Sequence, residues 1–115
     1  MSSNQKNEPI EHKLKRDLHY IERELIAKQN DGAYCKFSRA LDGISIIGLT
    51  QHQYENYWTN QYRSYKEQLP IITAACRNKF TTGLISQQEM IDRINNSHDH
   101  TKDREKAIKL LGGAV

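Results

Sequence analysis

Apolar residues recur at helical spacing along most of the chain. Between Pro9 and Gln29 they stand three or four positions apart and form a stripe about 80° wide on a helix. Its members are Ile10, Leu14, Leu18, Ile21 and Leu25. Alternation of apolar and polar residues, which is typical of a half-buried strand, nowhere extends beyond four residues. The pattern therefore predicts a first helix over residues 9–29.

The same spacing predicts further helices separated by turn residues. They are expected over residues 34–41, 50–69, 70–81, 86–95 and 101–111. Residues 44–48 fit either a buried extended connector or a continuation of the second helix. We therefore predict an all-α protein, a compact bundle of five to six short helices built from antiparallel helical hairpins. Residues 9–115 would form this single helical domain, after a flexible N-terminal segment at residues 1–8.

Two of the predicted helices have clear start signals. Thr50 and Gln53 fit a capping box, in which the hydroxyl accepts from one free backbone N–H and the amide group returns to another. Ser86 and Glu89 repeat the pattern. Pro70 cannot occupy a helix interior without breaking or kinking it. It is therefore expected to separate the third helix from the fourth.

The composition leaves only a thin apolar core. Leu, Ile, Val and Phe contribute 24 of 115 residues, close to the level of about 20% below which chains are usually disordered. We therefore expect the chain to form a homodimer or to bind a partner. No apolar run approaches the roughly 18 residues of a membrane span, and the N-terminus lacks the apolar segment of a secretory signal. Two distant cysteines are typical of a reduced protein, so the expected location is the cytoplasm, with no membrane contact.

Basic residues line up on two of the predicted helices, although the formal net charge is only +3. The first helix carries His12, Arg16, His19 and Arg23 along about 16 Å of its length, opposite the apolar stripe. The last helix carries Lys102, Lys106 and Lys109 on one side. Cations on one face can contact successive phosphates and displace condensed counterions. Both rows are therefore candidate nucleic-acid contacts, and the alternative for each is an ordinary solvated helix face.

The third helix presents an aromatic face formed by Tyr54, Tyr57, Trp58, Tyr62 and Tyr65. Such a face is most often part of the core. Tyrosine and tryptophan are also enriched in protein-binding hot spots, and aromatic rings can stack on unpaired bases. The aromatic face is therefore either core or a candidate partner-binding surface.

Residues Arg93 to His98 match the spacing R-x4-H and so resemble the motif of the all-helical ribonucleases of the HEPN superfamily. The resemblance covers six residues. It implies that Arg93 holds phosphate and that His98 performs acid–base chemistry on a ribose hydroxyl.

Taken together, the residues favour a small non-enzymatic regulatory protein that associates with nucleic acid through its basic helix faces. We find no phosphate-binding glycine loop and no nucleophile motif, and we expect neither a cofactor nor a metal. The abundance of Ile, Lys, Asn and Gln is typical of low-GC bacteria and their phages or mobile elements. The alternatives are a stoichiometric inhibitor or adaptor that binds a nucleic-acid-handling protein, and a HEPN-like ribonuclease.

Overall fold

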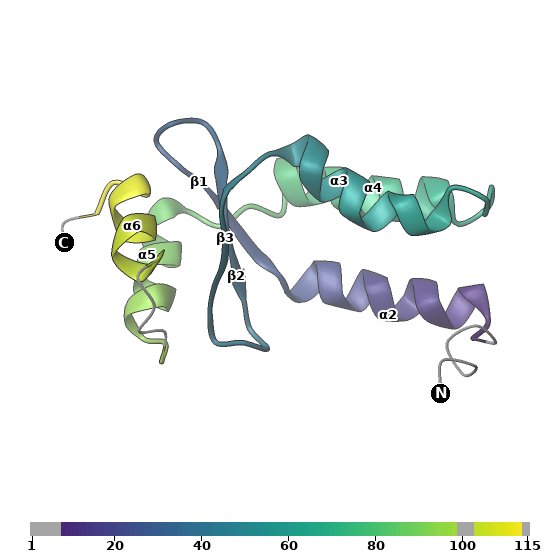
Figure 1. The fold of residues 1–115 in the computed structure, drawn as a ribbon, viewed down its shortest axis with the longest axis horizontal. Helices are drawn as coiled ribbons and strands as arrows, with labels where there is room; N and C mark the ends of the chain where they lie inside the picture. Colours follow the sequence, from purple (N-terminus) through teal and green to yellow (C-terminus); the bar gives the residue numbers. More distant parts are fainter. Residues whose placement is uncertain (1–7, 99–102, 114–115) are drawn as a thin grey trace.

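The computed structural model describes residues 8–98 and 103–113. Its helices are α2 (Ile10–Arg23), α3 (Gln51–Thr59), α4 (Leu69–Thr81), α5 (Gln87–Asn95) and α6 (Asp103–Leu110), with a short 3-10 helix, η1 (Asn60–Tyr62). Its strands are β1 (Leu25–Lys28), β2 (Tyr34–Ser38) and β3 (Gly43–Leu49). Figure 1 shows the sheet nearly edge-on, with α5 and α6 on one side and α2, α3 and α4 on the other.

The predicted all-α fold is wrong, because three strands form an antiparallel sheet in the order β1-β2-β3. The first helix ends at Arg23, and the residues expected to continue it form β1. The predicted helix over 34–41 is replaced by β2 and a turn, and residues 44–48 lie in β3. The protein is therefore a mixed α/β structure.

The first strand is buried on both faces of the sheet, and this explains why it does not show simple alternation. In β1, Leu25 and Ala27 pack into the core under α5 and α6, whereas Ile26 packs into the core with α2, α3 and α4. All three residues are buried, so the strand is a short continuous apolar run. Such a run cannot be distinguished from a helical segment by its periodicity.

An irregularity in the pairing of β2 with β3 explains why β3 also lacks a simple alternating pattern. The register shifts around Lys36, and Ile44 and Ile47 both pack into the core under α5 and α6 although they are three residues apart. Buried Gln29 supports this region by accepting a hydrogen bond from the backbone N–H of Gly48 (2.9 Å). Gly48 has a φ of 74°, a conformation that glycine adopts without steric cost.

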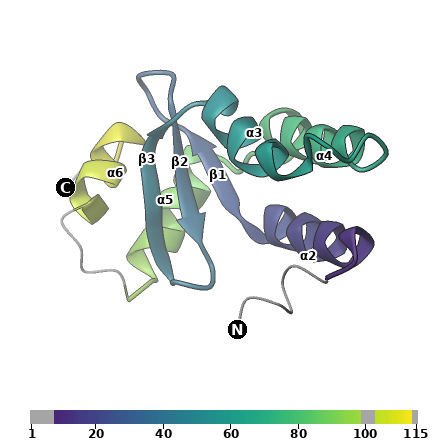
Figure 2. The same ribbon diagram turned by 45° about the vertical axis from the view of Figure 1, so that its right-hand side comes forward.

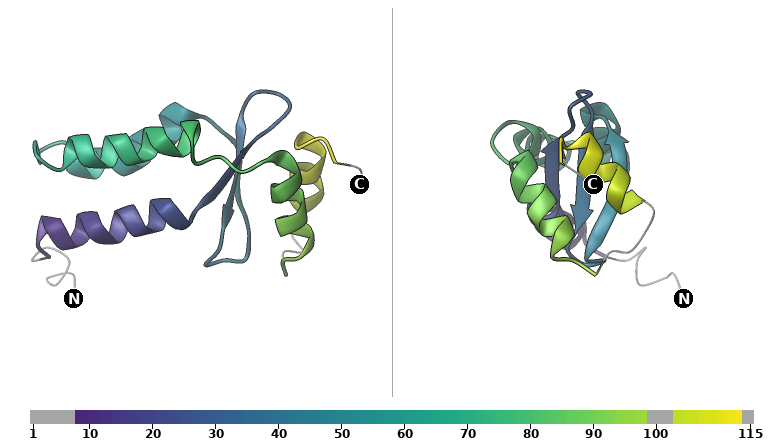
Figure 3. Two further views of the ribbon diagram at one scale, coloured as in Figure 1. Left: turned by 180° about the vertical axis from the view of Figure 1, so that it is seen from behind. Right: turned by 90° about the vertical axis from the view of Figure 1, so that its left-hand side faces the viewer.

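Two apolar cores result, one on each side of the sheet. The larger core joins the sheet to α2, α3, η1 and α4, and includes Leu14, Ile21, Ile26, Tyr54, Trp58, Tyr62, Ile72 and Phe80. The smaller core joins the sheet to α5 and α6, and includes Phe37, Met90, Ile94, Ala107, Ile108 and Leu111. Figure 3 shows α5 and α6 lying across their face of the sheet. The helices α2, α3 and α4 extend away from the opposite face.

The local helix signals are confirmed, although the predicted fold class is wrong. Thr50 caps α3 with the complete capping box, in which Gln53 N–H donates to Thr50 Oγ1 (3.1 Å) and Thr50 N–H donates to Gln53 Oε1 (3.0 Å). Ser86 caps α5 by accepting from the Glu89 N–H. Pro70 lies in the first turn of α4. The predicted helix over 50–69 is too long, because α3 ends at Thr59 and is followed by η1.

Candidate nucleic-acid interface

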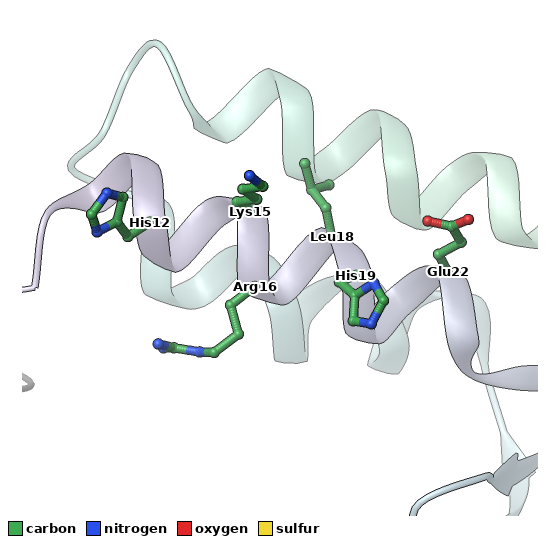
Figure 4. A pocket seen from close by; sticks show the side chains of 6 residues that line it. All are labelled: His12, Lys15, Arg16, Leu18, His19 and Glu22. Atoms are coloured by element: carbon green, nitrogen blue, oxygen red, sulfur yellow. The ribbon is translucent and has the colours of Figure 1, made fainter.

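The outer face of α2 carries the basic row predicted from the sequence. His12, Arg16, His19 and Arg23 are all exposed, and at 100° per residue they share one side of the helix. The opposite side contributes Leu14, Asp17 and Ile21 to the interior. In Figure 4, Arg16 and His19 lie on the side of α2 opposite to Leu18, which points toward α4. The row is therefore available to a ligand along almost the whole helix.

A shallow depression of about 590 Å³ follows this part of α2. It is lined by His12, Lys15, Arg16, Leu18, His19 and Glu22, which Figure 4 shows as sticks. Lys15 adds a fifth basic group beside the row. The lining is thus predominantly basic, with Glu22 near its C-terminal end.

An ion pair fixes the position of one of these arginines. The Arg16 guanidinium donates a hydrogen bond to the Glu8 carboxylate, and this bond raises the pKa of Arg16 above its ordinary value. Because both groups lie at the surface, a phosphate can replace Glu8 as the acceptor at little cost.

At the C-terminal end of α2 the structure brings in residues that the sequence analysis did not identify. Figures 1 and 2 show the turn between β2 and β3 projecting past α2 on the side away from α3 and α4. There a pocket of about 230 Å³ is lined by Tyr20, Arg23, Glu24, Ser38, Arg39 and Ala40. We call this pocket the corner. It adds an exposed tyrosine and a further arginine to the basic face of α2.

Glu24 connects the elements around the corner through hydrogen bonds. Its carboxylate accepts a hydrogen bond from Lys36 Nζ of β2 (2.6 Å) and another from Tyr54 Oη of α3 (2.6 Å). Burial, and next the charge of Glu24, raises the pKa of Tyr54 far above its ordinary value, so the phenol remains a proton donor. Glu24 directly follows α2 and precedes β1, and it therefore links the helix to the sheet.

The lysines predicted on the last helix do not join this surface. Lys106 and Lys109 are exposed on α6, which covers the sheet face opposite to α2 (Figures 1 and 3). Lys102 lies outside the described residues. The two predicted basic rows are therefore separate surfaces on a molecule 47 Å long.

The aromatic face of the predicted third helix is divided between core and surface. Tyr54, Trp58 and Tyr62 are buried, whereas Tyr57 and Tyr65 are exposed. Tyr57 lines a groove of about 590 Å³ between α3 and the sheet, together with Lys36, Ser45, Ile46, Leu49, Gln53 and Tyr54. Only part of the predicted partner surface is therefore open to a partner in this structure.

Arg93 and His98 fall at the C-terminal end of α5 and just beyond it. His98 uses its backbone N–H (3.0 Å) and Nδ1 (2.9 Å) to contact Asp42 Oδ2 in the β2–β3 turn. The contact with His98 holds the pKa of the Asp42 carboxyl below its usual range. The sheet contradicts the all-helical fold that the HEPN resemblance implies.

Over residues 8–98 and 103–113, no group of three or more His, Cys, Asp or Glu side chains is placed to hold a metal ion. None of the helices in this part of the chain has the length and apolar character needed to cross a membrane. Comparisons of the chain with protein families, with characterised proteins and with solved structures give no significant match.

Proposed function

We propose that this protein is a small non-enzymatic regulatory protein of the cytoplasm that binds nucleic acid through the outer face of α2. The observation that supports this function is the exposed row of His12, Arg16, His19 and Arg23 on α2. The first three residues of the row line one depression together with Lys15. The first and last members of the row are about 16 Å apart along the helix axis. A row of this length is long enough to contact several phosphates of one strand.

The physical basis of this binding is the release of counterions. Each phosphate that a cationic side chain neutralises frees condensed salt ions, so the affinity falls as the salt concentration rises. Arginine suits this role because its planar guanidinium can donate two parallel hydrogen bonds to one phosphate. Arg16 and Arg23 therefore supply the strongest contacts, and the two histidines of the row add polar contacts.

The double substitution Arg16→Glu with Arg23→Glu tests this function. We expect it to weaken binding of a labelled oligonucleotide by at least about tenfold and to reduce the slope of log affinity against log salt by roughly two. Fluorescence anisotropy at several salt concentrations measures both quantities. The matched control is Lys106→Glu with Lys109→Glu, which makes the same charge change on α6.

The two variants separate three outcomes. If only the α2 variant loses affinity, the proposed surface is correct. If both variants lose it equally, net charge rather than the α2 face determines binding, and the proposal is overturned. If only the α6 variant loses it, the interface lies on α6 and the assignment to α2 is wrong.

A protein partner is the second candidate, favoured by the groove in which Tyr57 is 65% exposed beside Ile46. In this function the chain is a stoichiometric inhibitor or adaptor of a nucleic-acid-handling protein. A tagged pull-down from bacterial lysate, with and without nuclease, distinguishes it from the first function. A single protein that survives nuclease treatment supports the inhibitor, whereas recovery of nucleic acid that is lost at higher salt supports binding through α2.

A homodimer also remains our prediction, because the apolar composition is low for an isolated domain. Sedimentation equilibrium at micromolar and higher concentrations measures the mass in solution. We expect twice the chain mass of 13.4 kDa. A mass of one chain throughout this range would contradict the dimer.

A further inference from the structure

We propose that the corner between α2 and the β2–β3 turn makes the protein selective for single-stranded nucleic acid. One unpaired base would stack on Tyr20, and the phosphates on either side of that base would contact Arg23 and Arg39. This inference rests on the proposed function, and it adds to it the form of nucleic acid that is bound.

The exposure of Tyr20 is the first observation that supports this selectivity. Tyr20 is 52% exposed, although it stands on a helix whose other large apolar residues face the interior or the seam with α4. It lines the corner together with Arg23 of α2 and Arg39 of the β2–β3 turn. Aromatic side chains between cationic groups are the arrangement with which single-strand-binding proteins hold a base and its backbone.

The charges in the corner favour an anion in spite of Glu24. Both carboxylate oxygens of Glu24 already accept hydrogen bonds, Oε1 from Tyr54 and Oε2 from Lys36. The positive charge of Lys36 therefore offsets the negative charge of Glu24 inside the corner. Arg23 and Arg39 are both exposed and leave the lining with a net positive charge.

The position of the turn favours an unpaired strand over a duplex. The β2–β3 turn projects past α2 (Figures 1 and 2), and its Arg39 lines the same pocket as Arg23 at the end of the basic row. A strand that follows α2 from Arg16 reaches Tyr20 and Arg23 and then meets Arg39. In a duplex the faces of the bases are covered by stacking on their neighbours, so an internal base cannot reach Tyr20 without leaving the helix.

The test compares an oligothymidylate of about 12 nucleotides with a blunt duplex of the same length, both by fluorescence anisotropy. We expect the wild-type protein to prefer the single strand. Tyr20→Leu should weaken single-strand binding by about tenfold and leave duplex binding unchanged, because stacking on one base contributes an effect of this size. Tyr20→Phe keeps the ring and should bind like the wild type.

Arg39 and two control positions complete the design. Arg39→Gln should weaken single-strand binding severalfold and reduce the salt slope by about 0.7, the value for one phosphate of a single strand. The matched controls are Tyr57→Leu, another exposed tyrosine that lies outside the corner, and Lys109→Gln on α6. Both controls should bind like the wild type. All five substitutions are at exposed positions, and thermal unfolding followed by circular dichroism checks that each variant is folded.

The outcomes distinguish this inference from the function on which it rests. If the wild-type protein binds neither oligonucleotide, the proposed function and the inference both fail. If Arg16→Glu with Arg23→Glu abolishes binding while Tyr20→Leu and Arg39→Gln bind like the wild type, α2 binds nucleic acid but the corner is not part of the site. Equal loss in Tyr20→Leu and Tyr57→Leu, or a wild-type preference for the duplex, also overturns the inference.

Discussion

Replacing Phe37 with alanine is expected to lower the free energy of unfolding by about 3–5 kcal/mol. Phe37 is 1% exposed and belongs to the core between the sheet and the α5–α6 pair. It lies on the central strand, opposite Leu25 of β1 and Ile44 of β3. Removing the ring leaves a cavity among neighbours on both flanking strands, and the fixed backbone of a central strand limits their collapse into it.

Leu41→Ala is the control that makes this measurement decisive about the fold. A helix over 34–41 would bury Phe37 and Leu41 together, because they are four residues apart. In the structure Leu41 is instead 75% exposed in the β2–β3 turn, so its truncation should change the free energy of unfolding by less than about 0.5 kcal/mol. Urea denaturation followed by circular dichroism measures both values. Similar large losses for the two variants would contradict the strand and support a helix.

Prediction from the sequence succeeds where an element depends on interactions between residues close together in the chain. The starts of α3 and α5 depend on hydrogen bonds between residues three positions apart, at Thr50 with Gln53 and at Ser86 with Glu89. Interactions of this range can be recognised in one sequence. The position of Pro70 in the first turn of α4 is predictable for the same reason.

The sheet could not be predicted because its burial depends on elements distant in the chain. The first three residues of β1 are buried, by α5 and α6 on one face of the sheet and by α2, α3 and α4 on the other. Leu25 follows Ile21 by four residues, and therefore continues the helical stripe as well as it begins a strand. Leu25 begins a strand because β1 pairs with β2, and the local sequence does not indicate this pairing.

The candidate site was likewise predictable only where its residues are close together in the sequence. The basic row on α2 could be predicted, since its members share a helix face through local spacing alone. Arg39 could not be added to that row, because the turn reaches α2 only after β2 pairs with β1. Spacing also groups Tyr54 with Tyr57, but only the structure shows that Tyr54 is in the core and Tyr57 at the surface.

Removing the carboxylate of Glu24 is expected to have the second-largest effect on stability. Glu24→Ala should lower the free energy of unfolding by about 2–3 kcal/mol, because it leaves the Lys36 ammonium and the Tyr54 hydroxyl without their partner. The side chains of Glu24 and Lys36 are each only 15% exposed, so water replaces the lost contacts poorly. Urea denaturation measures the loss, and Glu11→Ala, at an exposed position on α2, is the matched control.

A double-mutant cycle separates the ion pair from general packing. In Glu24→Ala with Lys36→Met no buried charge is left unpaired, so the combined loss should be smaller than the sum of the two single losses. Additive losses would show that the two residues do not interact in solution. The ion pair would then have no part in holding α2 against the sheet.

The change in nucleic-acid affinity caused by Glu24→Ala shows whether Glu24 acts through its negative charge or by positioning α2 against the β2–β3 hairpin. Loss of a negative charge beside Arg23 and Arg39 would by itself raise the affinity for a phosphate backbone. If Glu24 instead holds α2 and the β2–β3 hairpin at the angle that forms the corner, its removal should lower the affinity for the oligothymidylate severalfold under conditions where the variant is still folded. Tighter binding by Glu24→Ala would show that the arginines act through their charge alone, and that the geometry of the corner does not determine affinity.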